Sequence, residues 1–148
     1  MSRRPHLASY LIPMVLLGIV AWVGLAKCAF GETIRHDMGG SVAERLDQMR
    51  SISRVRIEGA CYSSCTLLLG APDACVTRNA RLGFHGPSTR SGLPLPRSEW
   101  ERVSLIMAEQ YPPKIRLWFL ATGRMVTGEM SVIRGRELIS MGVKECRK

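Results

Sequence analysis

Apolar positions along the chain follow two patterns. In some segments they recur on one side of a helix, and between these segments lie short stretches that favour strands. Strands are expected at 33–36, 55–57, 74–77 and 81–85. Because strands alternate with helical segments, the pattern predicts an α/β fold with parallel strands and crossover connections.

Two helices have clear start signals. Ser41 is the expected N-cap of a helix over 41–49, with Glu44 three residues further on. Ser98 and Glu101 form the same capping pattern at the start of 98–110. Further helices are expected at 65–69, 114–121 and 129–141, the last ending at Gly142.

The N-terminal segment predicts export. Arg3 and Arg4 precede an uncharged apolar stretch over 7–26, LASYLIPMVLLGIVAWVGLA. A positive start before such a stretch is typical of a signal peptide, and 29–31 offers small residues for cleavage. The stretch is also long enough to remain as a membrane anchor, since about 20 apolar residues span a bilayer. Both alternatives place the domain 32–148 in the periplasm or outside the cell, with membrane contact only through the N-terminal segment.

The net charge of the chain is +9, and nearly all of its basic residues are arginines. From Arg35 to Arg147 they are scattered singly, and no aromatic residue lies within a basic cluster. A nucleic-acid partner is therefore not expected. A basic module that acts on an anionic surface stays an alternative, and it requires the arginines to gather on one face.

Four cysteines remain after the export segment: Cys61, Cys65, Cys75 and Cys146. An even number in an exported chain predicts two disulfides, and the pairing stays open. Cys61 and Cys65 have a spacing that zinc sites also use, but no second close pair or nearby histidine completes such a site. We therefore expect no metal.

The segment 59–69, GACYSSCTLLL, carries the candidate chemistry. A strand ends at Gly59, the chain turns, and Ser64 begins an apolar helix, where it can face a cleft as a nucleophile. The N–H of Cys65, unpaired at the helix start, can then stabilise an oxyanion. In the alternative interpretation, Ser63 or Ser64 is only the N-cap of that helix.

Two other motifs match this chemistry. The pair Gly39–Gly40 follows the first expected strand, and its N–H groups can supply a second oxyanion donor. His85 ends the expected strand 81–85 and can accept the proton of Ser64. The alternatives are an ordinary turn at the glycines and a structural histidine bonded to a loop carbonyl.

In this order the motifs resemble the proteolytic subunit of Clp protease, within the Clp/crotonase superfamily. The segment 39–42 is similar to that family's glycine pair, and 79–87, NARLGFHGP, is similar to its Asn-x-Arg-x-x-x-His-x-Pro motif. Weaker similarities at 122–123 and 137–143 extend the resemblance over about residues 33–143. It implies a β-β-α superhelical spiral with no cofactor. It also implies Ser64 as nucleophile, His85 as base, and an oxyanion hole from Gly39 or Gly40 and Cys65.

The chain departs from the family in its third catalytic residue. The family has an aspartate after the histidine, whereas every aspartate of this chain precedes His85. The corresponding position falls near Met130, so the adjacent Glu129 is the expected substitute. The segment between His85 and Thr122 is shorter than the family's oligomerising handle, so its double ring is not expected, and a homo-oligomer stays open.

The sequence therefore predicts an exported serine hydrolase, peptidase-like, with a peptide or protein substrate. The alternative function is a non-catalytic relative that binds a peptide or partner protein in the same cleft.

Overall fold

The structure, a computed structural model, describes residues 30–147. Its strands are β1 (Phe30–Asp37), β2 (Ile52–Tyr62), β3 (Asp73–Val76), β4 (Arg81–Phe84) and β5 (Ser131–Arg134). Its helices are α1 (Val42–Met49), η1 (Ser63–Gly70), α2 (Arg97–Glu109), α3 (Pro113–Ala121), η2 (Gly123–Met125) and α4 (Gly135–Ser140), of which η1 and η2 are 3-10 helices. The expected export segment lies almost wholly outside this range. None of the described helices has the length and apolar character that a membrane crossing requires.

The five strands form one open sheet in the order β1-β2-β4-β5, with β3 also paired to β2. The long strand β2 makes this possible, because its residues 54–57 pair with β3 and its residues 60–62 pair with β4. The pairings of β1, β3 and β4 with β2 are parallel, as expected for an α/β fold. Only β5 runs antiparallel, against β4.

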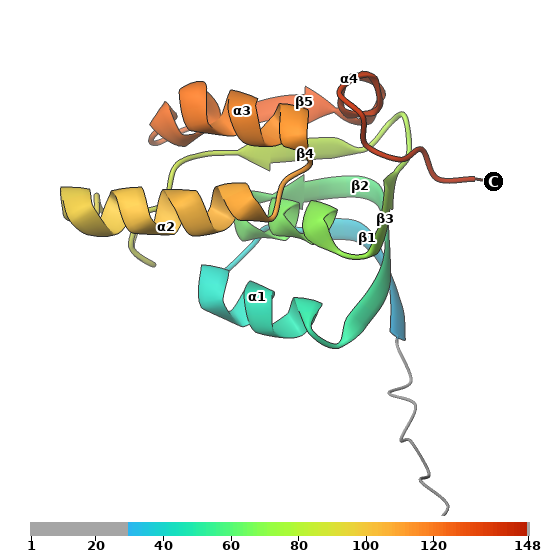
Figure 1. Cartoon of the computed structure of the whole chain (residues 1–148), viewed down its shortest axis with the longest axis horizontal. Helices are drawn as coiled ribbons and strands as arrows, with labels where there is room; N and C mark the ends of the chain where they lie inside the picture. The colour runs from blue at the N-terminus through green and yellow to red at the C-terminus, as the bar shows by residue number, and fades with distance from the viewer. Residues whose placement is uncertain (1–29, 148) are drawn as a thin grey trace, which may run out of the picture.

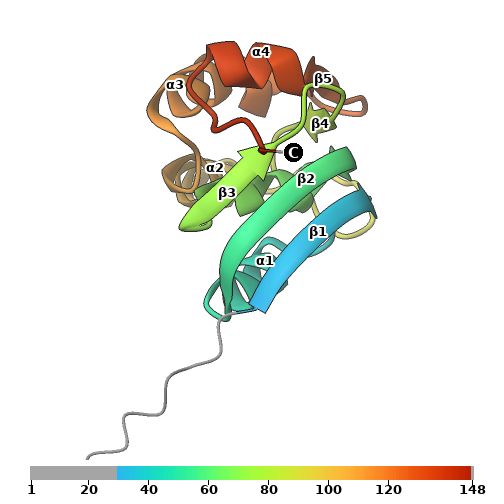
Figure 2. The ribbon, with the colours of Figure 1, turned by 90° about the vertical axis from the view of Figure 1, so that its right-hand side faces the viewer.

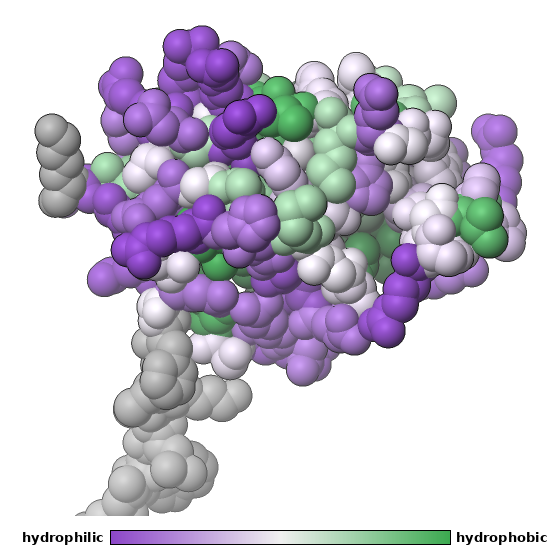
Figure 3. All heavy atoms as spheres, turned by 180° about the vertical axis from the view of Figure 1, so that it is seen from behind, coloured by the Kyte–Doolittle hydropathy of each residue, from purple (hydrophilic) through white to green (hydrophobic). Residues whose placement is uncertain are grey.

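The helices α1 and α2 cover the same face of the sheet: Figure 1 shows them together on one side of the molecule, and in Figure 2 they lie behind β1, β2 and β3. The short apolar helix η1 lies in the core, where Leu67 and Leu68 are fully buried beside Val55 and Ile57 of β2. Seen from behind, the surface is mostly hydrophilic, with apolar residues in small scattered groups (Figure 3).

Two expected helix starts are wrong. The helix α2 begins at Arg97 after Pro96 and has no side-chain cap, so the capping pattern of Ser98 is not used. The segment expected to be one helix over 129–141 is divided, because 131–134 pairs with β4 as strand β5 before α4 begins. Two β-branched residues, Val132 and Ile133, favour the strand here.

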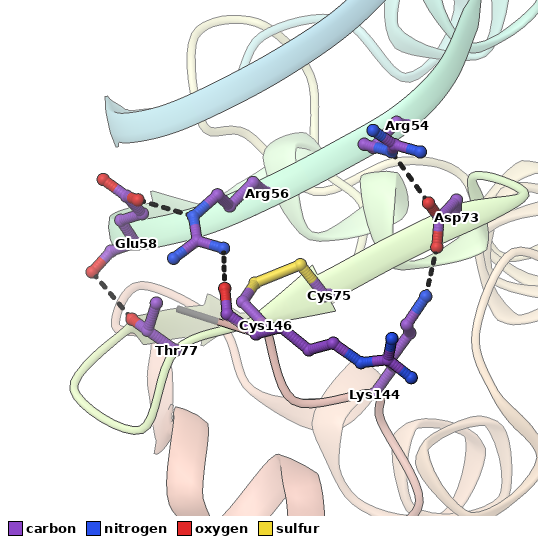
Figure 4. The surroundings of a disulfide bond; sticks show 9 residues. Arg54, Arg56, Glu58, Asp73, Cys75, Thr77, Lys144 and Cys146 are labelled. Atoms are coloured by element: carbon purple, nitrogen blue, oxygen red, sulfur yellow. Dashed lines mark hydrogen bonds and ion pairs between the residues drawn. A yellow bond between two sulfur atoms is a disulfide. The ribbon is translucent and has the colours of Figure 1, made fainter.

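Both expected disulfides are present, and the structure gives their pairing as Cys61–Cys65 and Cys75–Cys146. The second one joins β3 to the C-terminal segment, which runs alongside it and forms a parallel bridge between Glu145 and Val76. Beside it Asp73 accepts hydrogen bonds from Arg54 and Lys144 (Figure 4). Two disulfides are consistent with the oxidising compartment of an exported protein.

Candidate active site

The turn between β2 and η1 places Ser63 in an unusual backbone conformation. Ser63 follows the last residue of β2 directly and has φ +55°. Within residues 30–147 no other non-glycine residue has a positive φ. For an L-residue this conformation costs roughly 1–2 kcal/mol. Such residues persist where their surroundings hold them, and they concentrate at functional sites.

A disulfide spans this turn. Cys61 lies near the end of β2 and Cys65 in the first turn of η1, with a Cα–Cα distance of 5.3 Å. Both side chains are fully buried. The bond therefore ties the strand to the helix on either side of Ser63 and limits how far the turn can relax.

Two buried hydroxyl groups hold the backbone of the same turn. The hydroxyl of Thr66 donates to the carbonyl oxygen of Ser63 at 2.7 Å. Because that proton is used, the hydroxyl of Tyr111 must be the donor in its 2.8 Å contact with Thr66. Burial raises the pKa of Tyr111 well above its ordinary value, which keeps the phenol protonated and able to donate.

His85 faces Ser63 because two parallel strands end side by side. Gly83 of β4 is the register partner of Tyr62 of β2, so the residues that follow them meet at the carboxyl edge of the sheet. The Nε2 atom of His85 lies 2.7 Å from the Oγ atom of Ser63. The imidazole is half-buried, so it remains open to a ligand.

The other ring nitrogen of His85 determines the tautomer. Nδ1 lies 2.6 Å from the carbonyl oxygen of Gly86, which can only accept a hydrogen bond. Nδ1 therefore carries the proton and donates it. In the neutral ring Nε2 is then the acceptor, and the hydroxyl of Ser63 donates to it. This is the arrangement in which a histidine can remove a proton from serine.

The serine that contacts His85 is therefore one position earlier than expected. The Oγ atom of Ser64 is buried and has no hydrogen-bond partner among the described residues. The difference arises because β2 does not stop at Gly59, as expected, but continues to Tyr62. The turn then falls at Ser63, and Ser64 points into the interior from the first turn of η1.

Glu129 does not take the place of the missing aspartate. It is exposed in the segment before β5, and none of the hydrogen bonds among residues 30–147 joins it to His85. The contact expected of Glu129 is made by the carbonyl oxygen of Gly86 instead. A backbone oxygen next to the histidine needs no long-range packing to reach Nδ1.

The glycine pair lies directly against the serine turn. Gly39 has φ +88°, and a Cβ atom there would lie 2.6 Å from the Cβ of Ser63 and 3.0 Å from the backbone nitrogen of Ser64. Only glycine fits both the conformation and the space. The N–H of Gly39 donates to Asp37 at 2.7 Å, so it is not open to an oxyanion, whereas Gly40 lines the cleft beside Ser63.

A chain of polar side chains holds the glycine pair in place. Asp37 accepts from Gly39 and also from the buried Arg45 of α1 at 2.7 Å. Arg45 donates in turn to Gln48 at 2.6 Å, and Gln48 donates to Glu32 of β1 at 2.8 Å. Both ends of this chain lie on β1, so it fastens α1 to the strand that leads into the turn. Nothing in the spacing of these residues marks them as a group in the sequence.

The Ser63–His85 pair opens into a cleft of about 620 Å³. Its walls come from the start of α1, the segment 87–95 and the helix α2. Its lining combines apolar side chains, such as Met38, Val103 and Met107, with polar and charged ones that include Arg90 and Glu99. A cleft of this size and character fits a small organic group or an apolar side chain. Within residues 30–147, no group of three or more His, Cys, Asp or Glu side chains could hold a metal ion.

No protein-family model matches the chain, and no curated protein matches it. The site itself combines a serine hydroxyl that donates to His85, a histidine that is protonated at Nδ1, and the backbone of Gly40 and Ser64 in the same cleft.

Proposed function

We propose that the protein is an exported serine hydrolase, peptidase-like, with Ser63 as nucleophile and His85 as general base. The observation that carries this proposal is the 2.7 Å contact between Ser63 Oγ and His85 Nε2, in a ring whose Nδ1 proton is held by Gly86. The positive φ of Ser63 supports it, because a strained turn between a strand and a helix exposes a nucleophile in other hydrolases.

In the proposed reaction, Ser63 Oγ attacks the carbonyl carbon of the substrate while its proton passes to His85 Nε2. The carbonyl oxygen takes up the negative charge. We assign two backbone N–H groups to receive it: that of Ser64, which follows the nucleophile at the open start of η1, and that of Gly40, which lines the same cleft. With Ser63 as nucleophile, Ser64 replaces Cys65 as the donor next to it.

The tetrahedral intermediate then collapses. The bond between the carbonyl carbon and the leaving group breaks, and His85 gives its proton to the leaving group. The acyl group remains on Ser63 Oγ. Water attacks this ester with His85 again as base, and the acid leaves as Ser63 regains its proton.

We further propose that the fold is the β-β-α spiral of the Clp/crotonase superfamily. The order of Gly39–Gly40, the nucleophile and His85 along the chain supports this, as does the meeting of all three at one edge of a parallel sheet. A peptide or protein is the proposed substrate.

A second function is favoured by one observation: His85 has a neutral carbonyl as its partner and not a carboxylate. A non-catalytic relative that binds a peptide in the same cleft has no need of the carboxylate. The two functions differ in whether Ser63 reacts with an electrophile.

A fluorophosphonate probe tests the proposal. The full chain, produced with both disulfides formed, is incubated with the probe and the modified residue is identified by mass spectrometry. We expect labelling of Ser63, and its loss in Ser63→Ala and His85→Ala. Ser64→Ala is the matched control, because it removes a hydroxyl that has no partner; its labelling should equal that of the wild type. A folded protein that is not labelled, or that is labelled at Ser64, would contradict the proposal.

A further inference from the structure

Two hollows share a wall that His85 forms together with Pro87, Ser88, Gly92 and Met130. One is the 620 Å³ cleft, which also contains Ser63, Ser64 and Gly40. The other has a volume of about 300 Å³ and is lined by His85 and Gly86, but not by Ser63, Ser64 or the glycine pair. A substrate bound across the pair would therefore extend into both.

The chemistry of acyl transfer assigns a role to each hollow. The carbonyl oxygen of the substrate must point at the N–H groups of Gly40 and Ser64, so the acyl part occupies the larger cleft. The leaving group receives its proton from His85 Nε2 and must lie on the histidine side. The smaller hollow is the one of the two that has His85, but not Ser63, in its lining.

The lining of the smaller hollow carries one acidic side chain. Trp100 and Pro87 supply apolar surface, and Glu129 is the one residue there besides His85 whose side chain ionises. Within residues 30–147 no ion pair involves Glu129. Arg124, which lies over the ring of Trp100, is paired with Glu101 at 2.7 Å. The charge of Glu129 is therefore free to act on a ligand.

We propose that the smaller hollow binds the leaving group and that Glu129 selects leaving groups with a positive charge. In a peptide this means cleavage before lysine or arginine. The inference rests on the proposed hydrolase function. It gives Glu129 a role in specificity in place of the role in the triad that the sequence analysis expected.

Acyl transfer to amines tests this without a known peptide substrate. A p-nitrophenyl ester acylates Ser63 and releases p-nitrophenol, and an added amine then competes with water for the acyl group. In the transfer step the bond from the amine nitrogen to the carbonyl carbon forms and the bond from Ser63 Oγ breaks. The proton of the amine passes through His85 Nε2 to Ser63 Oγ. The amine occupies the site of the leaving group, by microscopic reversibility.

Lysinamide and norleucinamide are a matched pair of amines. Near pH 8 about half of each α-amine is neutral and can attack, whereas the ε-amine of lysine, with a pKa of about 10.4, is charged. We expect lysinamide to capture the acyl group about two to five times better, the effect of one partly exposed ion pair. Glu129→Gln should remove this preference. Glu109→Gln, an equal change of charge at the exposed end of α2, should keep it.

The outcomes separate this proposal from the function on which it rests. If neither p-nitrophenol release nor fluorophosphonate labelling occurs, the hydrolase function fails and the inference fails with it. If Ser63 is acylated but the two amines capture equally, or if Glu129→Gln keeps the preference, the hydrolase stands and the role of Glu129 is overturned.

Discussion

The two disulfides allow a test in which stability and reactivity respond differently. Cys61–Cys65 spans the serine turn with a sequence separation of 4, and Cys75–Cys146 joins β3 to the C-terminal segment with a separation of 71. The perturbation is to replace each pair by alanine in a separate double variant. We expect loss of Cys75–Cys146 to lower the free energy of unfolding at least as much as loss of Cys61–Cys65 does. Only loss of Cys61–Cys65 should slow the labelling of Ser63.

The magnitudes follow from the lengths of the closed loops. On the chain-entropy relation, a separation of 71 contributes about 4.4 kcal/mol to stability, whereas a separation of 4 contributes about 2 kcal/mol. Because Cys61 and Cys65 are fully buried, loss of their sulfur atoms adds about 1–2 kcal/mol to the cost of the local variant. The two variants should therefore be destabilised to a comparable degree, or the remote one more.

Reactivity should follow a different order. Without the local disulfide, Ser63 can leave its positive-φ conformation and gain roughly 1–2 kcal/mol. A gain of 1.4 kcal/mol reduces the population of the reactive turn about tenfold. The second-order rate of fluorophosphonate labelling is measured at a temperature where circular dichroism shows both variants folded. Labelling should fall about tenfold in the local variant and stay within about twofold of the wild type in the remote one. Equal labelling rates in the two variants would refute the reasoning.

Two further predictions concern the supports of the same turn. Gly39→Ala should abolish labelling, because the added Cβ would overlap Ser63. Gly142→Ala is the control: it imposes a similar positive-φ strain, but no atom lies within 4 Å of its Cβ, so labelling should be kept. An equal loss of labelling in both variants would show that backbone strain, and not the overlap with Ser63, is responsible. Burial raises the pKa of Tyr111, so above about pH 10 the unfolded chain releases this proton first and stability falls with rising pH. Tyr111→Phe should make that fall shallower by up to about 1.4 kcal/mol per pH unit, measured by urea unfolding between pH 9 and 11; an unchanged slope would contradict it.

Much of the fold could be predicted from local sequence patterns. Ser41 caps α1 by accepting the N–H of Glu44, as its position three residues before the glutamate predicts. The parallel pairing of β2 with its neighbours follows from the alternation of strands and helices. The strand β5 was missed because its stability comes from pairing with β4, a contact between residues about 50 positions apart.

The position of the serine turn could have been predicted from the alternation of buried residues along β2. Val55, Ile57 and Cys61 all point into the core with a period of two, so the strand continues past Gly59 and the turn falls at Ser63. Gly59 interrupts this alternation and therefore favours an earlier end of the strand. The partner of His85 Nδ1 could not be predicted in this way, because a backbone carbonyl leaves no mark in the sequence.

The carbonyl oxygen of Gly86 supplies part of what an aspartate supplies in a catalytic triad. It fixes the tautomer of His85 as a carboxylate does, so the base is ready to accept the proton of Ser63. In a serine protease triad, replacing the aspartate by asparagine costs about 10⁴ in rate because the wrong tautomer forms. Here the tautomer is right, and the missing contribution is the attraction between a full negative charge and the imidazolium.

A hydrogen bond to a charged group contributes about 1.5–3 kcal/mol, and one between neutral groups about 0.5–1.5 kcal/mol. With a carbonyl acceptor in place of a carboxylate, the transition state loses about 1–1.5 kcal/mol, or about tenfold in rate. In the proposed hydrolase, the contact with Gly86 would therefore let the Ser63–His85 pair work without a third acidic residue. It also predicts that Ser63 reacts readily with activated acyl donors such as p-nitrophenyl esters, and that amide bonds, whose cleavage depends most on the protonated histidine, are hydrolysed more slowly.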